Sequence, residues 1–143
     1  MDLDFDFPSV VDAAWLQTNL SKVKVLDASW HMPASGRDAK AEFQACRIPG
    51  ARFFDLDAVA DTSSELPHML PSAAAFAAAA QALGVSPQDA LVAYDSHGLF
   101  SAPRAWWMWK VFGHGRVAVL DGGLPAWRAA GGALDASPAS REQ

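Results

Sequence analysis

Two short apolar runs set the strongest limit on what this chain can fold into. Residues 90–94 read Ala-Leu-Val-Ala-Tyr and residues 117–120 read Val-Ala-Val-Leu, and neither run contains a charged side chain. A strand that is apolar on both of its faces has to be buried on both, which is typical of parallel sheets covered by helices. We therefore expect an α/β protein.

Helix and strand patterns alternate along the rest of the chain. Further strands are predicted over residues 23–26 and 52–54, and helices over residues 10–20, 37–45, 72–83, 101–112 and 125–130. Ser72 is well placed to cap the third of these helices, and Gly84 to end it. The pattern predicts one domain over residues 1–134, a mostly parallel central sheet with helices on both faces, and the start of a polar linker over residues 135–143.

Composition and charge argue against several function classes. The 143 residues suit one domain, and the net charge of -5 argues against nucleic acid as a partner. No apolar run reaches the ~18 residues of a membrane span, and the acidic residues 1–8 differ from a signal peptide. Cys46 is the only cysteine and the four histidines are widely spaced, so neither a disulfide nor a metal pair is expected. These features predict a cytosolic protein with no membrane partner and no cofactor.

The loop that follows residues 90–94 is the first candidate site. Its residues are Asp95, Ser96, His97, Gly98, Leu99 and Phe100. A short loop between a buried strand and a helix N-terminus points backbone N–H groups at a bound anion. Asp95 places a fixed negative charge there, which either repels an anionic substrate or accepts the N–H groups itself. The capping preference of aspartate favours the second interpretation.

Five stretches of the chain form a distinctive set: residues 98–109, 112–114 and 120–127, together with residues 48–57 and 68–71. Together they resemble a known family, the tandem-domain rhodaneses, which are thiosulfate and 3-mercaptopyruvate sulfurtransferases. The resemblance extends from about Val23 to Gly132 and implies a rhodanese-like fold. It also implies a parent enzyme that moves a sulfane sulfur from 3-mercaptopyruvate or thiosulfate to a thiol or cyanide acceptor.

The resemblance implies that this chain is the amino-terminal half of such an enzyme, without its nucleophile. In that family the cysteine that forms the persulfide lies on the matching loop of the second domain, and Asp95 takes its place here. A carboxylate cannot carry a persulfide, so we expect the chain alone to be inactive. Its expected partners are the C-terminal rhodanese domain of the same chain and a small anionic sulfur donor. Cys46 lies outside the loop and is interpreted as structural or incidental.

Asp57 and His68 form a second constellation, a carboxylate and an imidazole separated by one loop. From the residues alone they are either a pair that orients a base or an ordinary loop histidine and aspartate. The resemblance implies the former, a supporting catalytic pair that acts across the domain boundary with a serine of the second domain. Phe100 stands where some relatives carry tyrosine, which leaves the substrate preference open.

Arg104 begins the Trp-rich helix, and two roles are open for it. It either faces an anionic substrate or forms a structural ion pair with a carboxylate such as Asp95, and the bidentate geometry of arginine favours the ion pair. In the same helix Trp106 and Trp107 are adjacent, so they cannot both point inward. We expect one of these indoles to be exposed or to pack on another domain.

Two other functions stay open at this point. Residues 53–57, Phe-Phe-Asp-Leu-Asp, resemble the paired-aspartate motif of the haloacid-dehalogenase-like magnesium phosphohydrolases. The Gly-Thr that usually follows that motif is absent, and the downstream lysine and acidic pair are not evident. The remaining alternative is a stand-alone rhodanese-like module that binds or regulates, because a fold by itself does not fix a function.

Overall fold

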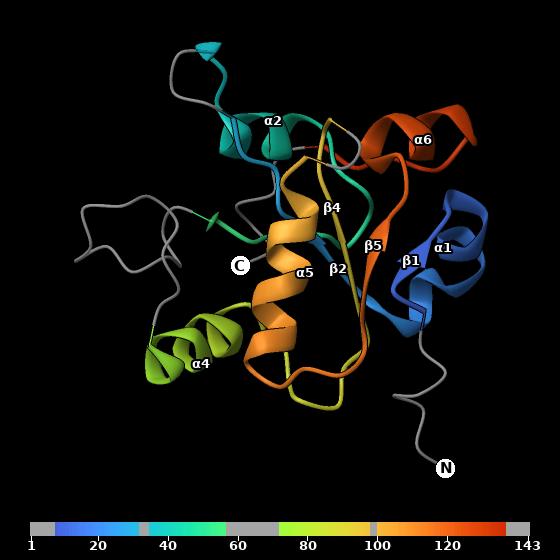
Figure 1. The fold of residues 1–143 in the computed structure, drawn as a ribbon. Helices are drawn as coiled ribbons and strands as arrows, with labels where there is room; N and C mark the ends of the chain where they lie inside the picture. The colour runs from blue at the N-terminus through green and yellow to red at the C-terminus, as the bar shows by residue number, and fades with distance from the viewer. Residues whose placement is uncertain (1–7, 32–34, 57–71, 98–99, 137–143) are drawn as a thin grey trace.

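The computed structural model describes residues 8–31, 35–56, 72–97 and 100–136 (Figure 1). It confirms the predicted α/β architecture, with five parallel strands in the order β1-β5-β4-β2-β3. The strands are β1 (Val10–Val11), β2 (Lys24–Asp27), β3 (Arg52–Phe53), β4 (Leu91–Tyr94) and β5 (Val117–Leu120). The helices are α1 (Ala13–Asn19), η1 (Leu20–Lys22), α2 (Ala39–Ala45), α4 (Ala73–Ala82), α5 (Ala102–Val111) and α6 (Gly123–Ala129).

Alternate side chains of the inner strands enter two separate cores. Leu91 and Ala93 of β4 pack on the α4 and α5 side, whereas Val92 and Tyr94 pack on the side of α1, α2 and α6. All four are fully buried. The continuous apolar runs of the sequence therefore correspond to strands that are covered on both faces, as expected.

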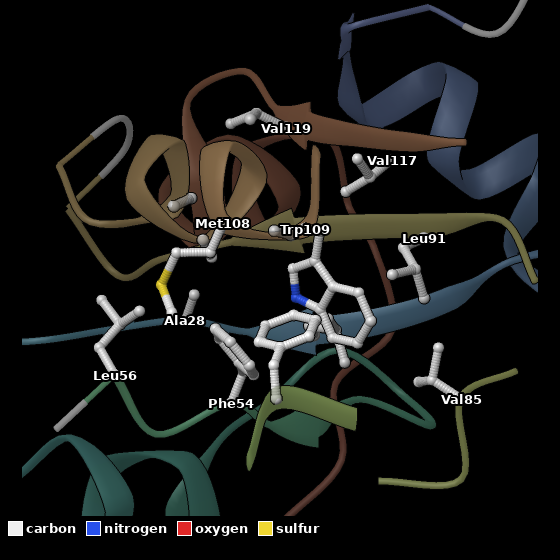
Figure 2. Close-up of a cluster of buried hydrophobic side chains, with 14 residues drawn as sticks. Ala28, Phe54, Leu56, Val85, Leu91, Met108, Trp109, Val117 and Val119 are labelled. Carbon is white, nitrogen blue, oxygen red and sulfur yellow. The ribbon is translucent and has the colours of Figure 1, made fainter. Parts of the chain in front are cut away.

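The α5 core is dominated by aromatic side chains. Figure 2 shows Trp109 and Met108 of α5 with Phe54 and Leu56 close by. Trp107, two residues before Trp109, is 41% exposed. Its neighbour Trp106 is partly buried and donates its indole N–H to a backbone carbonyl of β5. The expectation that one of the two adjacent tryptophans stays exposed is confirmed.

The main difference from the predicted elements lies at the start of the chain. Val10 and Val11, expected at the start of a helix, form the edge strand β1 beside β5. The helix α1 begins only after Asp12, whose carboxylate accepts the backbone N–H of Trp15. A two-residue strand has no periodicity of its own, and only its pairing with β5 defines it.

Two strands at the middle of the sheet determine where a site can form. The connection that leaves β2 runs through α2 to β3, and the connection that leaves β4 runs through α5 to β5 on the other side. The two helices also cover opposite faces of the sheet. In open parallel sheets, a crevice forms at the carboxyl ends of neighbouring strands whose connections diverge in this way.

Candidate functional site

The loops that follow β2 and β4 meet at this crevice and are hydrogen-bonded to each other. The backbone N–H of Ser96 donates to Ser29 Oγ at 3.0 Å, and the hydroxyl of Ser101 donates to the carbonyl of Ala28 at 2.7 Å. Ser29 and Ser101 are both buried. The β4 loop is therefore held against the β2 loop by buried polar contacts, which stabilise one arrangement of the two segments.

Asp95 is the first residue of the β4 loop, and its carboxylate accepts hydrogen bonds from the backbone of the loop. One oxygen accepts the N–H of His97 at 2.9 Å. The other accepts three N–H groups, from Phe100, Ser101 and Ala102, at 2.9, 2.8 and 2.7 Å. Ala102 is the first residue of α5, so the carboxylate also caps that helix. The structure agrees with the interpretation in which Asp95 accepts the loop N–H groups.

The Asp95 carboxylate takes the place that an external anion would occupy in the β4 loop. The side chain of Asp95 is completely buried, and its two oxygens occupy the position at which converging N–H groups would stabilise an external anion. An anionic ligand or a thiolate could use those donors only by displacing the carboxylate. The loop has the geometry of an anion site that is already occupied by its own side chain.

A second buried carboxylate, Asp27, ends the neighbouring strand β2. Its Oδ1 accepts the backbone N–H of Ser29 at 2.9 Å. Burial raises the pKa of Asp27 above its ordinary value, and the hydrogen bonds from Ser29 and Tyr94 oppose that rise. The nearby charge of Asp95 raises the pKa of Asp27 further.

A cavity of about 460 Å³ opens beside these carboxylates, between the strand ends and the helices α2 and α6. Its polar walls include Asp27, Ser29 and Ser96. Two arginines also line it, Arg37 before α2 and Arg128 in α6. The combination of arginines with hydroxyl groups suits a small polar or anionic ligand.

Cys46 is half-buried and lies on the wall of this cavity, at the end of α2. Its Sγ accepts a hydrogen bond from Arg128 Nη2 at 3.1 Å. Cys46 is thus remote in sequence from the β4 loop but shares a cavity with Ser96 of that loop. No pattern in the sequence indicates that Cys46 lies near this loop.

A chain of ionisable side chains runs from the β4 loop to α2. His97 Nε2 lies 3.0 Å from His31 Nδ1, and His31 Nε2 lies 2.8 Å from Glu42 Oε1. Glu42 in turn accepts two hydrogen bonds from Arg37, at 2.9 and 3.0 Å. The side chain of His31 is only 2% exposed, whereas His97 is exposed. The hydrogen bonds from Arg37 hold the pKa of Glu42 below its usual range, with a smaller effect from His31.

Aromatic side chains surround the exposed end of the β4 loop. Phe100 is 51% exposed, stacks on Trp30 with ring centroids 6.2 Å apart, and meets the His97 ring edge-on at 5.0 Å. On α5, the guanidinium of Arg104 lies 4.9 Å from the centroid of the Trp107 ring. The ion pair expected between Arg104 and Asp95 stays a prediction. Exposed aromatic groups next to polar ones are typical of surfaces that bind a partner.

Several predicted site residues fall outside the part of the chain that the structure describes. They are Asp57, His68, Gly98 and Leu99. Within the described residues, no cluster of three or more His, Cys, Asp or Glu side chains could hold a metal ion. Within the same residues, no helix is both long and apolar enough to cross a membrane.

The site residues that were not predicted from the sequence are Asp27, Ser29, Trp30, His31, Arg37, Glu42 and Arg128. His31 and His97 are 66 positions apart, and Arg128 and Cys46 are 82 apart. No local pattern connects residues at such separations. The one available signal is that His31 shortly follows the end of β2, at the same edge of the sheet as the loop after β4.

Comparison with known proteins gives consistent matches. Residues 12–130 match the family described as Rhodanese-like domain. The thiosulfate/3-mercaptopyruvate sulfurtransferase 2 of Arabidopsis thaliana is 54% identical over 130 residues, which cover 90% of this chain and 38% of that protein. The 3-mercaptopyruvate sulfurtransferase of Escherichia coli is 43% identical over 121 residues, covering 82% of this chain and 43% of that protein.

A solved structure agrees with these matches. The crystal structure of the Escherichia coli 3-mercaptopyruvate sulfurtransferase SseA superposes with a TM-score of 0.86 at 40% identity. The superposition covers 90% of this chain and 50% of that one. The present chain therefore spans half or less of the length of these relatives.

Proposed function

Because the chain belongs to the rhodanese-like domain family, we propose that it is the non-catalytic amino-terminal half of a two-domain sulfurtransferase. The whole enzyme would move a sulfane sulfur from 3-mercaptopyruvate or thiosulfate to a thiol or cyanide acceptor. The proposal is supported by the names of relatives of about twice the length or more: one is named for both donors and another for 3-mercaptopyruvate. The nucleophilic cysteine would belong to the second domain.

The single observation that carries this proposal is the hydrogen bonding of Asp95. Sulfane transfer needs a thiolate that attacks sulfur and then holds it as a persulfide, and a loop of N–H groups stabilises both anionic forms. Here four N–H groups bind a carboxylate that cannot take up sulfur. The loop therefore contributes support for the fold and leaves the chemistry to another loop.

The exposed aromatic surface supports a second domain as the partner. Phe100 of the β4 loop stacks on Trp30, and Trp107 lies in α5, the helix that follows the loop. Phe100 and Trp107 are each more than one-third exposed. Large apolar side chains that stay exposed in one domain are commonly buried against another. We propose that this surface forms one wall of the cleft between the two domains and that a small anionic sulfur donor binds in that cleft.

Asp57 and His68 belong to the same proposal. They would support catalysis from this wall by orienting a group of the second domain's loop. Location in the cytosol likewise stays a proposal, and one relative is named as mitochondrial.

Activity of the chain alone tests the proposal most directly. With thiosulfate or 3-mercaptopyruvate as donor and cyanide as acceptor, the 143-residue chain should form no thiocyanate above the rate in buffer. The same chain joined to its second domain should turn over.

The control is the Cys46→Ser variant, which removes the only thiol of the chain. Turnover by the chain alone that disappears in this variant would make Cys46 the nucleophile and contradict the proposal. An inactive two-domain protein would instead favour a binding or regulatory module.

A further inference from the structure

The hydrogen-bonded chain from His97 through His31 to Glu42 has no part in the function proposed so far. It joins an exposed imidazole on the β4 loop to a carboxylate on the cavity wall, through an imidazole that is buried between them. We propose that His97 is the catalytic base that takes the proton of the thiol that accepts the sulfur. His31 and Glu42 position His97 and stabilise the positive charge that proton uptake creates. This inference rests on the proposed sulfurtransferase function.

The direction of the hydrogen bonds follows from Glu42. An ionised carboxylate only accepts, so His31 must donate through Nε2 at 2.8 Å. A neutral His31 then presents the lone pair of Nδ1, and His97 must donate to it through Nε2 at 3.0 Å. The remaining nitrogen of His97, Nδ1, consequently carries a lone pair. Because His97 is exposed, that lone pair is available to a molecule outside the domain.

The same chain can move a proton inward. When Nδ1 of His97 takes a proton, the Nε2 proton of His97 can pass to Nδ1 of His31. The positive charge then lies on His31 beside the Glu42 carboxylate, which Arg37 keeps ionised. In nucleophilic triads a carboxylate orients an imidazole base and stabilises its protonated form. Here a second imidazole lies between the carboxylate and the base.

An acceptor thiol is the reactant that has to lose a proton. Its S–H proton would go to His97 Nδ1, and the thiolate would attack the terminal sulfur of the protonated persulfide (–S–SH) on the second domain's cysteine. The bond between the two persulfide sulfurs breaks, the cysteine leaves as a thiolate, and the acceptor departs as a protonated persulfide. The sulfane sulfur changes carrier without net oxidation, and the proton on the histidines returns to solvent. The aromatic side chains of Phe100 and Trp30 next to His97 would flank the acceptor.

The charged groups around the two imidazoles are known for each neighbouring element. Asp95 accepts the backbone N–H of His97 in the β4 loop, and Asp27 lies at the end of β2. Glu42 in α2 and Arg37 before it complete the set. Three carboxyl groups and one guanidinium are thus the charged groups named on the elements next to the pair.

The first test uses the chain by itself and reads the tautomers by ¹⁵N NMR of the imidazoles. In their neutral forms, both His31 and His97 should carry the proton on Nε2. Replacement of the carboxylate in Glu42→Gln should weaken this preference in His31, whereas Lys40→Ala, an exposed change on the same helix, should not. A neutral His97 protonated on Nδ1 would overturn the assigned direction and the role as base.

The second test uses the two-domain enzyme and compares two acceptors. A thiol acceptor has a proton to lose, whereas the sulfite dianion has none. His97→Gln should lower kcat/KM for the thiol by roughly 10²-fold, as expected for loss of a general base, and leave sulfite within about twofold. His31→Gln and Glu42→Gln should give smaller losses, about 10-fold, and should shift the pH profile of the thiol reaction only. Lys40→Ala should change neither reaction.

The outcomes separate the two proposals. Equal loss with both acceptors, or no loss with either, overturns the role of His97 while leaving sulfur transfer intact. No transfer to either acceptor by the unmodified two-domain protein overturns the proposed function, and the role of His97 with it. Selective loss with the thiol supports both.

Discussion

Asp95 and Asp27 are two buried carboxylates at the ends of neighbouring strands, and they differ in the number of hydrogen bonds that they accept from the backbone. Asp95 accepts four backbone N–H groups, three of them on one oxygen. Asp27 accepts one backbone N–H and has its pKa raised by burial. Desolvation penalises both carboxylates, but only Asp95 has an array of N–H donors to offset it.

The difference shows which of the two groups organises the site. The backbone of the β4 loop is arranged around the charge of Asp95, so the loop needs that charge to satisfy its own N–H groups. Asp27 accepts one backbone N–H group, that of Ser29. When Asp27 is protonated, its carboxyl group keeps the same shape and can still bind its neighbours. We therefore expect substitutions of the two residues to differ strongly in their effect on stability.

The largest effect is expected for Asp95→Ala. It removes the acceptor of four buried or half-buried N–H groups and the cap of α5, so the free energy of unfolding should fall by about 3 kcal/mol or more. Denaturant unfolding of the 143-residue chain measures this. The matched control is Asp12→Ala, which removes an exposed cap of α1 with a single N–H bond and should cost about 1 kcal/mol. Equal losses in the two variants would show that the burial of Asp95 adds nothing.

An intermediate effect is expected for Ser29→Ala, because Ser29 contacts both halves of the comparison. Its Oγ accepts the N–H of Ser96, and its hydrogen bonds lower the pKa of Asp27. Loss of the hydroxyl should cost about 1–2 kcal/mol of unfolding free energy and raise the pKa of Asp27 further. Ser35→Ala, which removes an exposed hydroxyl from the N–H of Arg37, should change stability by less than about 0.5 kcal/mol. If Ser29→Ala is as stable as Ser35→Ala, the hydrogen bond between Ser96 and Ser29 contributes little to the stability of the domain.

The smallest effect at neutral pH is expected for Asp27→Asn, within about 1 kcal/mol. Its signature is the pH dependence. Because the pKa of Asp27 is raised in the folded state, the stability that it contributes is full below the pKa of an unfolded aspartate. That contribution is lost as the pH rises through the pKa of folded Asp27. The difference in unfolding free energy between Asp27→Asn and the unmodified chain should therefore shift in favour of the variant over that interval, and a constant difference would contradict the raised pKa.

The central sheet could be predicted from the sequence because its inner strands are buried on both faces. The runs that became β4 and β5 contain no polar residue other than a tyrosine hydroxyl, and no other element type suits such short apolar segments. The helix α4 was equally predictable, because Ser72 caps it through the N–H of Ala75 and Gly84 follows it with a positive φ of 77°. The two-residue strand β1 could not be predicted, because it is defined by its pairing with β5 and not by a pattern of its own.

The site could be predicted only where one segment contains it. Asp95 and its donors all lie between residues 95 and 102, so the preference of aspartate for helix N-termini was enough to suggest their arrangement. The pairs His31 with His97 and Cys46 with Arg128 join segments far apart in sequence. Their contact depends on the order of strands in the sheet and on the packing of α2 and α6, which no local pattern encodes.

The backbone pairing of Arg47 with Asp135 bears on how other parts of a protein could reach this domain. Each residue donates its N–H to the carbonyl of the other, at 2.9 and 2.8 Å, and the Arg47 guanidinium also binds the carbonyl of Ala136. Asp135 and Ala136, which follow α6, are thereby fixed next to Cys46, a residue of the cavity wall. For anything tethered beyond Ala136, the effective concentration at the cavity is set by a tether that begins at this anchor. A short tether samples a small volume around that anchor, next to the wall of the cavity.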